Sequence, residues 1–231
     1  MKLVKQQHEL KVHVPKEDND DDGHQNKIHS NLLMNDIRCS LIGPSNCGKS
    51  ALLIGLLEHP KGIKFQHIYV CGKTLHQPRY KKLEGIIETI PEMSFNAYHD
   101  LEEFPDFDSI PPFSVCVFDD LGHERQQGKI QNIFSYGRHK GLNSFYCCQT
   151  YCKIPKHLIR DNMNLLILFK MDLTNLRHIY EEHVVNDVSF KEFLEMCSLC
   201  WKNPYGFMVI CPTLPLNNGR YRHGFDEFFQ L

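Results

Sequence analysis

Residues 43–50 have the types and spacing of a phosphate-binding loop. They read GPSNCGKS, which matches G-x-x-x-x-G-K-S. The two glycines let the backbone bend so that its N–H groups point at phosphate oxygens, and a following helix would add its positive N-terminus. The residues predicted to contact a nucleotide are Gly43, Pro44, Ser45, Asn46, Cys47, Gly48, Lys49, Ser50 and Ala51. Lys49 would reach the β- and γ-phosphates, and the Ser50 hydroxyl would bind Mg²⁺. The alternative is a glycine turn before a helix with an incidental lysine.

Two adjacent carboxylates follow an apolar run later in the chain. Residues 114–120 read SVCVFDD, so Asp119 and Asp120 come where a buried strand would end. Ligands bind at the carboxyl ends of strands in open α/β sheets. We expect Asp119 to hold Mg²⁺ and Asp120 to polarise the attacking water as a general base. Alone, the pair could equally be a strand ending in an Asp-rich turn.

A polar amide ends a third apolar run. Residues 143–150 read NSFYCCQT, with Gln149 near the end. A buried amide without a partner costs about 1–3 kcal/mol, so Gln149 needs one. A γ-phosphate or the attacking water would serve, and the alternative is an amide that only caps the strand.

These residues need a scaffold, and the hydrophobic pattern predicts a mostly parallel α/β sheet with helices on both faces. Short apolar runs bounded by turn residues indicate strands buried on both faces. The expected strands cover residues 37–43, 67–72, 114–120, 143–150, 164–170 and 205–213. The expected helices cover residues 49–58, 79–90, 124–137, 174–184 and 190–201. This alternation is typical of βαβ units.

Composition and charge fit one globular domain with a polar leader. Residues 1–30 contain the acidic run EDNDDD and few apolar residues, so we expect a disordered leader, then an ATPase domain over 31–214 and a C-terminal tail over 215–231. The net charge is −2, so any contact with DNA must be local. With no signal peptide and no apolar run of about 18 residues, we expect no membrane span and ten reduced cysteines inside a cell.

The chain resembles the genome-packaging ATPases of large DNA viruses. These are the poxvirus type, found also in virophages and Maverick/Polinton transposons, within the FtsK/HerA superfamily of P-loop NTPases. The resemblance rests on the G-x-x-x-x-G-K-S loop, the strand ending Asp-Asp, the block YGRHKGLNSFYCCQTYCKIPKHLIRDNMNLLILFK and the segment FLEMCSLCWKNPYGFMVI. It covers about residues 37 to 213, and its most specific part runs from Arg138 to Lys170.

The resemblance implies a fold and an activity. The strand that ends at Gln149 would be inserted between the strand before Lys49 and the strand ending at Asp119. Subunits would form a ring that binds ATP at its interfaces, with Arg138 reaching the neighbour's γ-phosphate and Arg160 as a second interface candidate. The ring would hydrolyse ATP to translocate double-stranded DNA, held through its phosphates, into a capsid. The host-cell interior and the virion are the implied locations, and capsid proteins the implied partners.

Several alternatives stay open. Many superfamily members carry glutamate where this chain has Asp120, which leaves the identity of the water-activating base open. Another DNA translocase of the superfamily, a non-hydrolysing scaffold or a small-molecule kinase are rival functions. A zinc site formed by His178, His183, Cys197 and Cys200 competes with core cysteines on an amphipathic helix. The basic clusters at 73–83 and 153–160 are either DNA-facing loops or solvated surface. The tail either docks on another protein or packs on its own domain.

Overall fold

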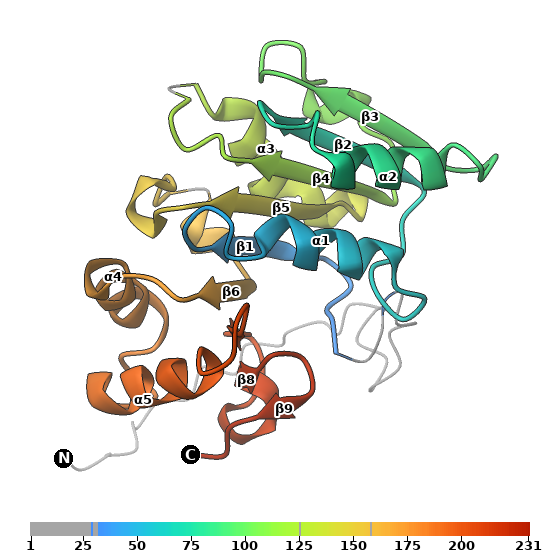
Figure 1. Ribbon diagram of the computed structural model, residues 1–231. Coiled ribbons are helices and arrows are strands. Elements are labelled where there is room, and N and C mark those ends of the chain that lie inside the picture. The colour runs from blue at the N-terminus through green and yellow to red at the C-terminus, as the bar shows by residue number, and fades with distance from the viewer. Residues whose placement is uncertain (1–28, 30–31, 125, 158) are drawn as a thin grey trace, which may run out of the picture.

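The protein forms one sheet with helices on both faces (Figure 1). A computed structural model describes residues 29, 32–124, 126–157 and 159–231. The predicted leader, residues 1–30, lies outside these residues except for His29. The predicted α/β class is confirmed.

The sheet has nine strands in the order β3-β2-β4-β5-β1-β6-β7-β8-β9. Its strands are β1 Arg38–Ile42, β2 His67–Gly72, β3 Ser94–Tyr98, β4 Ser114–Asp119, β5 Asn143–Cys148, β6 Leu165–Phe169, β7 Phe207–Ile210, β8 Tyr221–His223 and β9 Glu227–Phe228. The strands from β3 to β6 pair in parallel, and β7, β8 and β9 add antiparallel. Because β5 lies between β1 and β4, the strand order implied by the resemblance is confirmed.

The helices follow the predicted alternation. They are α1 Lys49–Glu58, α2 Pro78–Ile87, α3 Gly128–Tyr136, α4 Leu173–His183 and α5 Phe190–Cys200. α3 begins later than the expected residue 124. The Gln127 side chain donates to the carbonyls of Leu121 and Glu124, which ties these two residues to the start of the helix. At α5, Ser189 and Glu192 form a reciprocal capping box that fixes the start.

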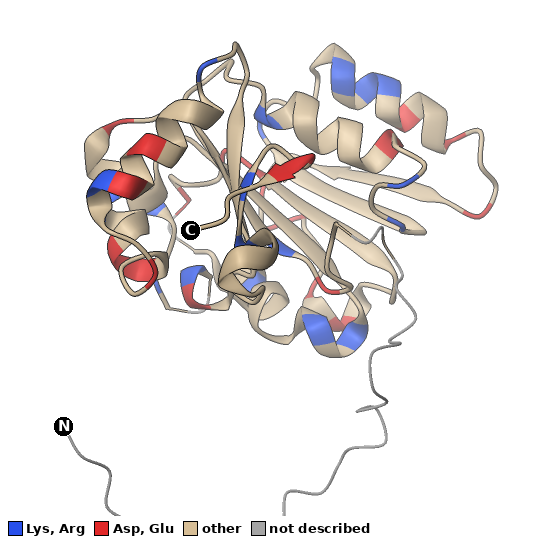
Figure 2. Cartoon of the chain, turned by 90° about the horizontal axis from the view of Figure 1, so that it is seen from below, with Lys and Arg blue, Asp and Glu red and all other residues tan. Residues whose placement is uncertain are grey.

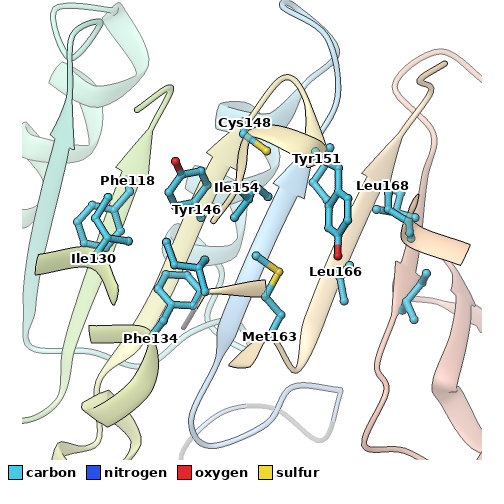
Figure 3. Close-up of a cluster of buried hydrophobic side chains, with 14 of the residues drawn as sticks. Phe118, Ile130, Phe134, Tyr146, Cys148, Tyr151, Ile154, Met163, Leu166 and Leu168 are labelled. Atoms are coloured by element: carbon cyan, nitrogen blue, oxygen red, sulfur yellow. The ribbon is translucent and has the colours of Figure 1, made fainter. Parts of the chain in front are cut away.

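Two hydrophobic cores lie on the two faces of the sheet. Successive side chains of a strand point to opposite faces, so Leu41 belongs to the core under α1 and α2 whereas Ile42 belongs to the core under α3, α4 and α5. Figure 3 shows part of the second core, where Phe134 of α3 lies near Tyr146 of β5. Burial on both faces explains why a central strand such as β6 is a continuous apolar run.

The C-terminal segment packs on its own domain. β8 pairs with β7, and the Tyr221 side chain is fully buried. Arg220 makes two 2.8 Å bonds to the carboxylate of Asp187, and Tyr221 donates to the same carboxylate. Arg222 donates to the Leu32 carbonyl. Within the described residues the segment is therefore part of the sheet, as one of the two expected arrangements had it.

Charged residues surround an apolar centre. In Figure 2 most of the central sheet is tan, and the blue and red segments lie mainly on helices and loops.

Eight of the ten cysteines are buried. Burial raises the pKa of thiols such as that of Cys116, to about 12, so these thiols stay protonated. No helix in the described part of the chain is long and apolar enough to cross a bilayer.

Candidate functional site

Strand register brings the three predicted motifs to one edge of the sheet. Ile42 pairs with Cys148, and Asp119 pairs with Cys147. The phosphate-binding loop follows β1, Gln149 follows β5, and Asp119 ends β4. These strands are parallel, so all three motifs lie at their carboxyl ends, where open α/β sheets bind ligands.

The loop after β1 leads directly into α1. Gly48 has φ of 110°, a conformation that side chains avoid, and it is the N-cap residue of α1. No side chain caps this helix and its first turn holds no acid, so its leading N–H groups face the loop. The Lys49 ammonium donates to the carbonyls of Gly43 and Pro44, at 2.6 and 2.8 Å. The loop can thus present backbone N–H groups and one cation to an anion.

Asp119 is a buried carboxylate with a fixed geometry. Burial raises the pKa of this carboxyl, and a hydrogen bond from Tyr80 and the charge of Lys49 partly oppose that shift. The Tyr80 hydroxyl donates to Asp119 Oδ2 at 2.8 Å and also contacts the Ser50 side chain. Gly72 on β2 makes room, because a Cβ there would lie 2.8 Å from the Asp119 carbonyl oxygen. Ser50 and Asp119 are oxygen donors of the kind that Mg²⁺ prefers, so they fit this ion.

Asp120 and Gln149 contact each other at the open side of the site. Gln149 Nε2 donates to Asp120 Oδ2 at 3.2 Å, and both residues are exposed. The expectation that Gln149 is buried and needs a partner for that reason is therefore wrong for this structure. The Gln149 amide donates to the Asp120 carboxylate, which can also accept hydrogen bonds from water.

A cavity of about 870 Å³ unites these groups. Its lining is Ser45, Asn46, Gly48, Lys49, Ser50, Ala51, Leu52, Thr74, Gln77, Arg79, Asp119, Asp120, Gln149, Phe169, Tyr205 and Phe207. Gly43, Pro44 and Cys47 from the predicted contact set are not part of this lining. Its volume lies within the range of ordinary ligand pockets.

Backbone strain gathers at this cavity. In the described residues four non-glycine residues have positive φ, and three of them, Asn46, Asp120 and Tyr205, line the cavity. Such conformations cost about 1–3 kcal/mol each and cluster at functional sites. The fold therefore stores strain where the predicted chemistry lies.

The first turn of α2 contributes residues that sequence reasoning missed. Gln77 and Arg79 line the cavity, and Tyr80 contacts Asp119. Both Arg79 and Tyr80 lie in the cluster at 73–83, which the sequence presented as either a DNA-facing loop or solvated surface. The position of that cluster after a strand's carboxyl end indicates which end of the sheet it occupies, but no local pattern assigns Tyr80 to Asp119.

Arg138 lies at the other edge of the sheet. It is exposed in the turn before β5. Burial lowers the pKa of Arg38, the first residue of β1, and the charge of Arg138 adds a smaller lowering. Its side chain donates to His139 at 3.2 Å. The length of β5 therefore separates Arg138 from the cavity of its own chain.

Arg160 is engaged within its own chain. Its guanidinium bonds Glu182 at 2.7 Å and lies 5.0 Å from the centre of the Tyr151 ring. Only 11% of the side chain is exposed. Of the two candidate interface arginines, Arg138 is thus the accessible one.

The proposed zinc ligands have other partners. Cys197 and Cys200 are buried, and Cys197 Sγ lies 3.5 Å from the sulfur of Met208. His183 Nε2 lies 2.7 Å from the Tyr151 hydroxyl, and His178 is exposed on α4. Among the described residues no cluster of three or more His, Cys, Asp or Glu could hold a metal ion. The structure therefore supports core cysteines.

Both basic clusters contain cations that pair with carboxylates and cations that are exposed. At 73–83, Lys73 pairs with Glu124 at 2.7 Å and Lys82 pairs with Glu58 at 3.4 Å. At 153–160, Lys153 and Lys156 are exposed. Both clusters follow strands at the same edge as the cavity.

Comparison with known proteins finds similarity in structure only. No family model and no curated protein matches the chain. The genome-packaging NTPase B204 of Sulfolobus turreted icosahedral virus 2, solved with sulfate, superposes with a TM-score of 0.54 at 15% identity, covering 78% of this chain and 94% of that one. Its complex with AMPPCP gives a TM-score of 0.53 at the same identity and coverage. B204 from Sulfolobus turreted icosahedral virus, a DNA-packaging ATPase, gives 0.52 at 15% identity, covering 77% and 92%. The chain therefore has the fold of a P-loop NTPase, similar to that of these viral packaging enzymes.

Proposed function

We propose that this protein is an ATPase that binds and hydrolyses ATP in the cavity at the carboxyl edge of its sheet. One observation carries the proposal: Lys49, Ser50, Asp119, Asp120 and Gln149 come from three separate segments and line a single cavity. A turn with an incidental lysine, or a strand with an incidental acid, would not require that convergence.

The chain's own groups divide the work of phosphoryl transfer. Lys49 and the N–H groups at the start of α1 hold phosphate oxygens and offset their charge. Asp120 orients the attacking water and accepts its proton, and Gln149 holds that carboxylate and contacts the water or the γ-phosphate. Ser50 and Asp119 would hold Mg²⁺, which neutralises charge on the β- and γ-phosphates.

We further propose that hydrolysis drives double-stranded DNA into a capsid. The resemblance in residues 37–213 and the similarity to B204, whose published structures describe a genome-packaging NTPase, both support this role. The chain would act as a ring, with capsid proteins as partners, inside the host cell or the virion. Because Arg138 lies across the sheet from its own cavity, it would stabilise charge at the neighbour's γ-phosphate.

The test is the rate of ATP hydrolysis with and without long double-stranded DNA. We expect DNA to stimulate the parent. We expect Lys49→Ala to lower the rate at least a hundredfold and Arg138→Ala about a thousandfold. Arg177→Ala, which removes an exposed arginine of α4, is the matched control and should keep the parent rate.

Mixing the two inactive variants tests the ring. Lys49→Ala subunits can donate Arg138 to neighbours whose Lys49 is intact, so the mixture should recover activity. A hydrolysis rate that does not change with DNA would reduce the proposal to a generic ATPase. An Arg138→Ala protein with full activity would exclude the role of Arg138 at the neighbour's γ-phosphate. A parent that does not hydrolyse ATP would favour the non-hydrolysing scaffold.

A further inference from the structure

The cavity has two chemically different ends on the two sides of β1. On the β5 and β4 side lie Gln149, Asp119 and Asp120. On the β6 and β7 side lie Phe169 and Phe207, with the exposed Tyr205 beside them. The phosphate-binding loop follows β1 and so lies between the two ends.

The aromatic end is in contact with the phosphate-binding loop. A Cβ placed on Gly48 would lie 3.4 Å from the Phe169 ring and 3.5 Å from the Tyr205 ring. The rings of Phe169 and Phe207 pack with their centroids 5.7 Å apart. These two rings form a wall, and Tyr205 lies at its outer rim.

Tyr205 has two properties that packing does not explain. The residue is 72% exposed, more than any other large hydrophobic residue in the described part of the chain. Its φ of 61° is a left-handed conformation, which is unfavourable for a residue with a bulky side chain. A strained and exposed aromatic ring at the rim of a cavity is a candidate ligand contact.

The turn that carries Tyr205 is held in place from below. Trp201 Nε1 donates to the Leu168 carbonyl of β6 at 2.9 Å, and Gly206 donates its N–H to the Asn203 carbonyl at 3.1 Å. A Cβ on Gly206 would collide with the carbonyl oxygen of Cys200, so only glycine fits there. The backbone at Tyr205 is thereby held in place before a ligand binds.

We infer that Tyr205 stacks on the base of the bound nucleotide, with Phe169 and Phe207 forming the wall of the base pocket. This inference rests on the proposed function. A nucleotide that lies along the loop with its γ-phosphate by Asp120 must extend its base toward the opposite, aromatic end. Stacking on an aromatic ring suits any purine because every base has a π-face.

The experiment compares two ligands that share the phosphates and differ in the base. Equilibrium binding of ATP and of inorganic tripolyphosphate, each with Mg²⁺, is measured on the full chain and on Tyr205→Ala and Tyr205→Phe. We expect Tyr205→Ala to weaken ATP binding about tenfold and to leave tripolyphosphate binding within twofold. Tyr205→Phe keeps the ring and should bind ATP like the parent.

Phe228→Ala, which removes an exposed aromatic ring on β9, is the matched control and should bind both ligands normally. If Tyr205→Ala binds ATP like the parent, or loses both ligands equally, the base contact is excluded while the proposed function stands. If the parent binds neither ligand, the proposed function fails and takes this inference with it.

Discussion

The amino and carboxyl ends of the parallel strands, here called the amino edge and the carboxyl edge of the sheet, place their polar residues in opposite environments. At the amino edge Asn143 accepts a hydrogen bond from the Ile37 N–H at 2.9 Å, and Asn164 accepts one from the Arg38 N–H at 2.8 Å. Both asparagines are buried, and both bond backbone groups that would otherwise be orphaned at the start of β1.

At the carboxyl edge the polar groups remain open to a cavity. Asp119 is buried with a raised pKa, and Asp120 is exposed and has a positive φ of 58°. The asparagines at the amino edge have backbone hydrogen-bond partners and stabilise the fold. The carboxylates at the carboxyl edge lower its stability but remain available for a ligand. The comparison teaches that polar residues at a strand end indicate chemistry only where their hydrogen bonds are not already completed by the backbone.

Asp119→Asn should produce the largest effect and separate stability from activity. Removal of the carboxylate charge should lower ATP hydrolysis at least a thousandfold, because Ser50 would lose its partner for Mg²⁺. It should also raise the Tm by a few degrees at neutral pH, since a buried charge disappears. Tm and ATPase rate measured on the same preparation check both parts.

The gain in stability should depend on pH in a defined direction. Burial raises the pKa of Asp119 in the folded protein above its ordinary value of 3.8. The parent therefore loses stability as the pH rises from the ordinary value through the raised one. The variant lacks this loss. The difference in Tm should therefore grow from acid toward neutral pH, and a less stable variant at neutral pH would contradict the account of this edge.

Asn143→Ala should have the opposite pattern. It leaves the buried Ile37 N–H without an acceptor, so we expect the free energy of unfolding to fall by about 2 kcal/mol, measured by urea denaturation. Hydrolysis per folded molecule should stay within twofold of the parent. Asn132→Ala, at an exposed position of α3, is the control and should change stability by less than about 0.5 kcal/mol. If Asn143→Ala lowered the free energy of unfolding no more than Asn132→Ala does, the distinction between the edges would be lost.

Tyr80→Phe should have the smallest effect. It removes the hydrogen bond that lowers the pKa of Asp119, so that pKa should rise further and the acid limb of the rate profile should move to higher pH. Mg²⁺ affinity, taken from the Mg²⁺ dependence of hydrolysis, should weaken about tenfold. Tyr146→Phe, which removes a buried hydroxyl bonded to Gln127, is the control. An unchanged pH profile in Tyr80→Phe would show that the hydroxyl only packs.

Much of the sheet could be predicted from sequence because its central strands are buried on both faces. Runs such as Leu165–Phe169 are continuously apolar, and that pattern has few other interpretations. β3 was not predicted, because Ser94–Tyr98 is a half-buried edge strand with polar residues in it. β8 and β9 are short, and their place depends on long-range bonds such as Arg220 to Asp187.

The candidate site was predictable where one segment carries its own chemistry. The loop at 43–50 and the pair Asp119 and Asp120 are local patterns with a known mechanism. Tyr80 and Tyr205 could not be found in this way, because each reaches the site through packing between elements distant in sequence. No spacing in the sequence encodes those contacts.

β5 is a buried strand that connects the candidate site to the opposite end of the sheet. All six of its residues are buried and it pairs with strands on both sides, so it cannot bend or slide without breaking both ladders. Gln149 follows the carboxyl end of β5, and at the other end the turn with Arg138 is closed by the bond from the Leu142 N–H to the Gly137 carbonyl. The same buried strand therefore links the two residues, so a displacement of β5 as a whole would move Gln149 and Arg138 together.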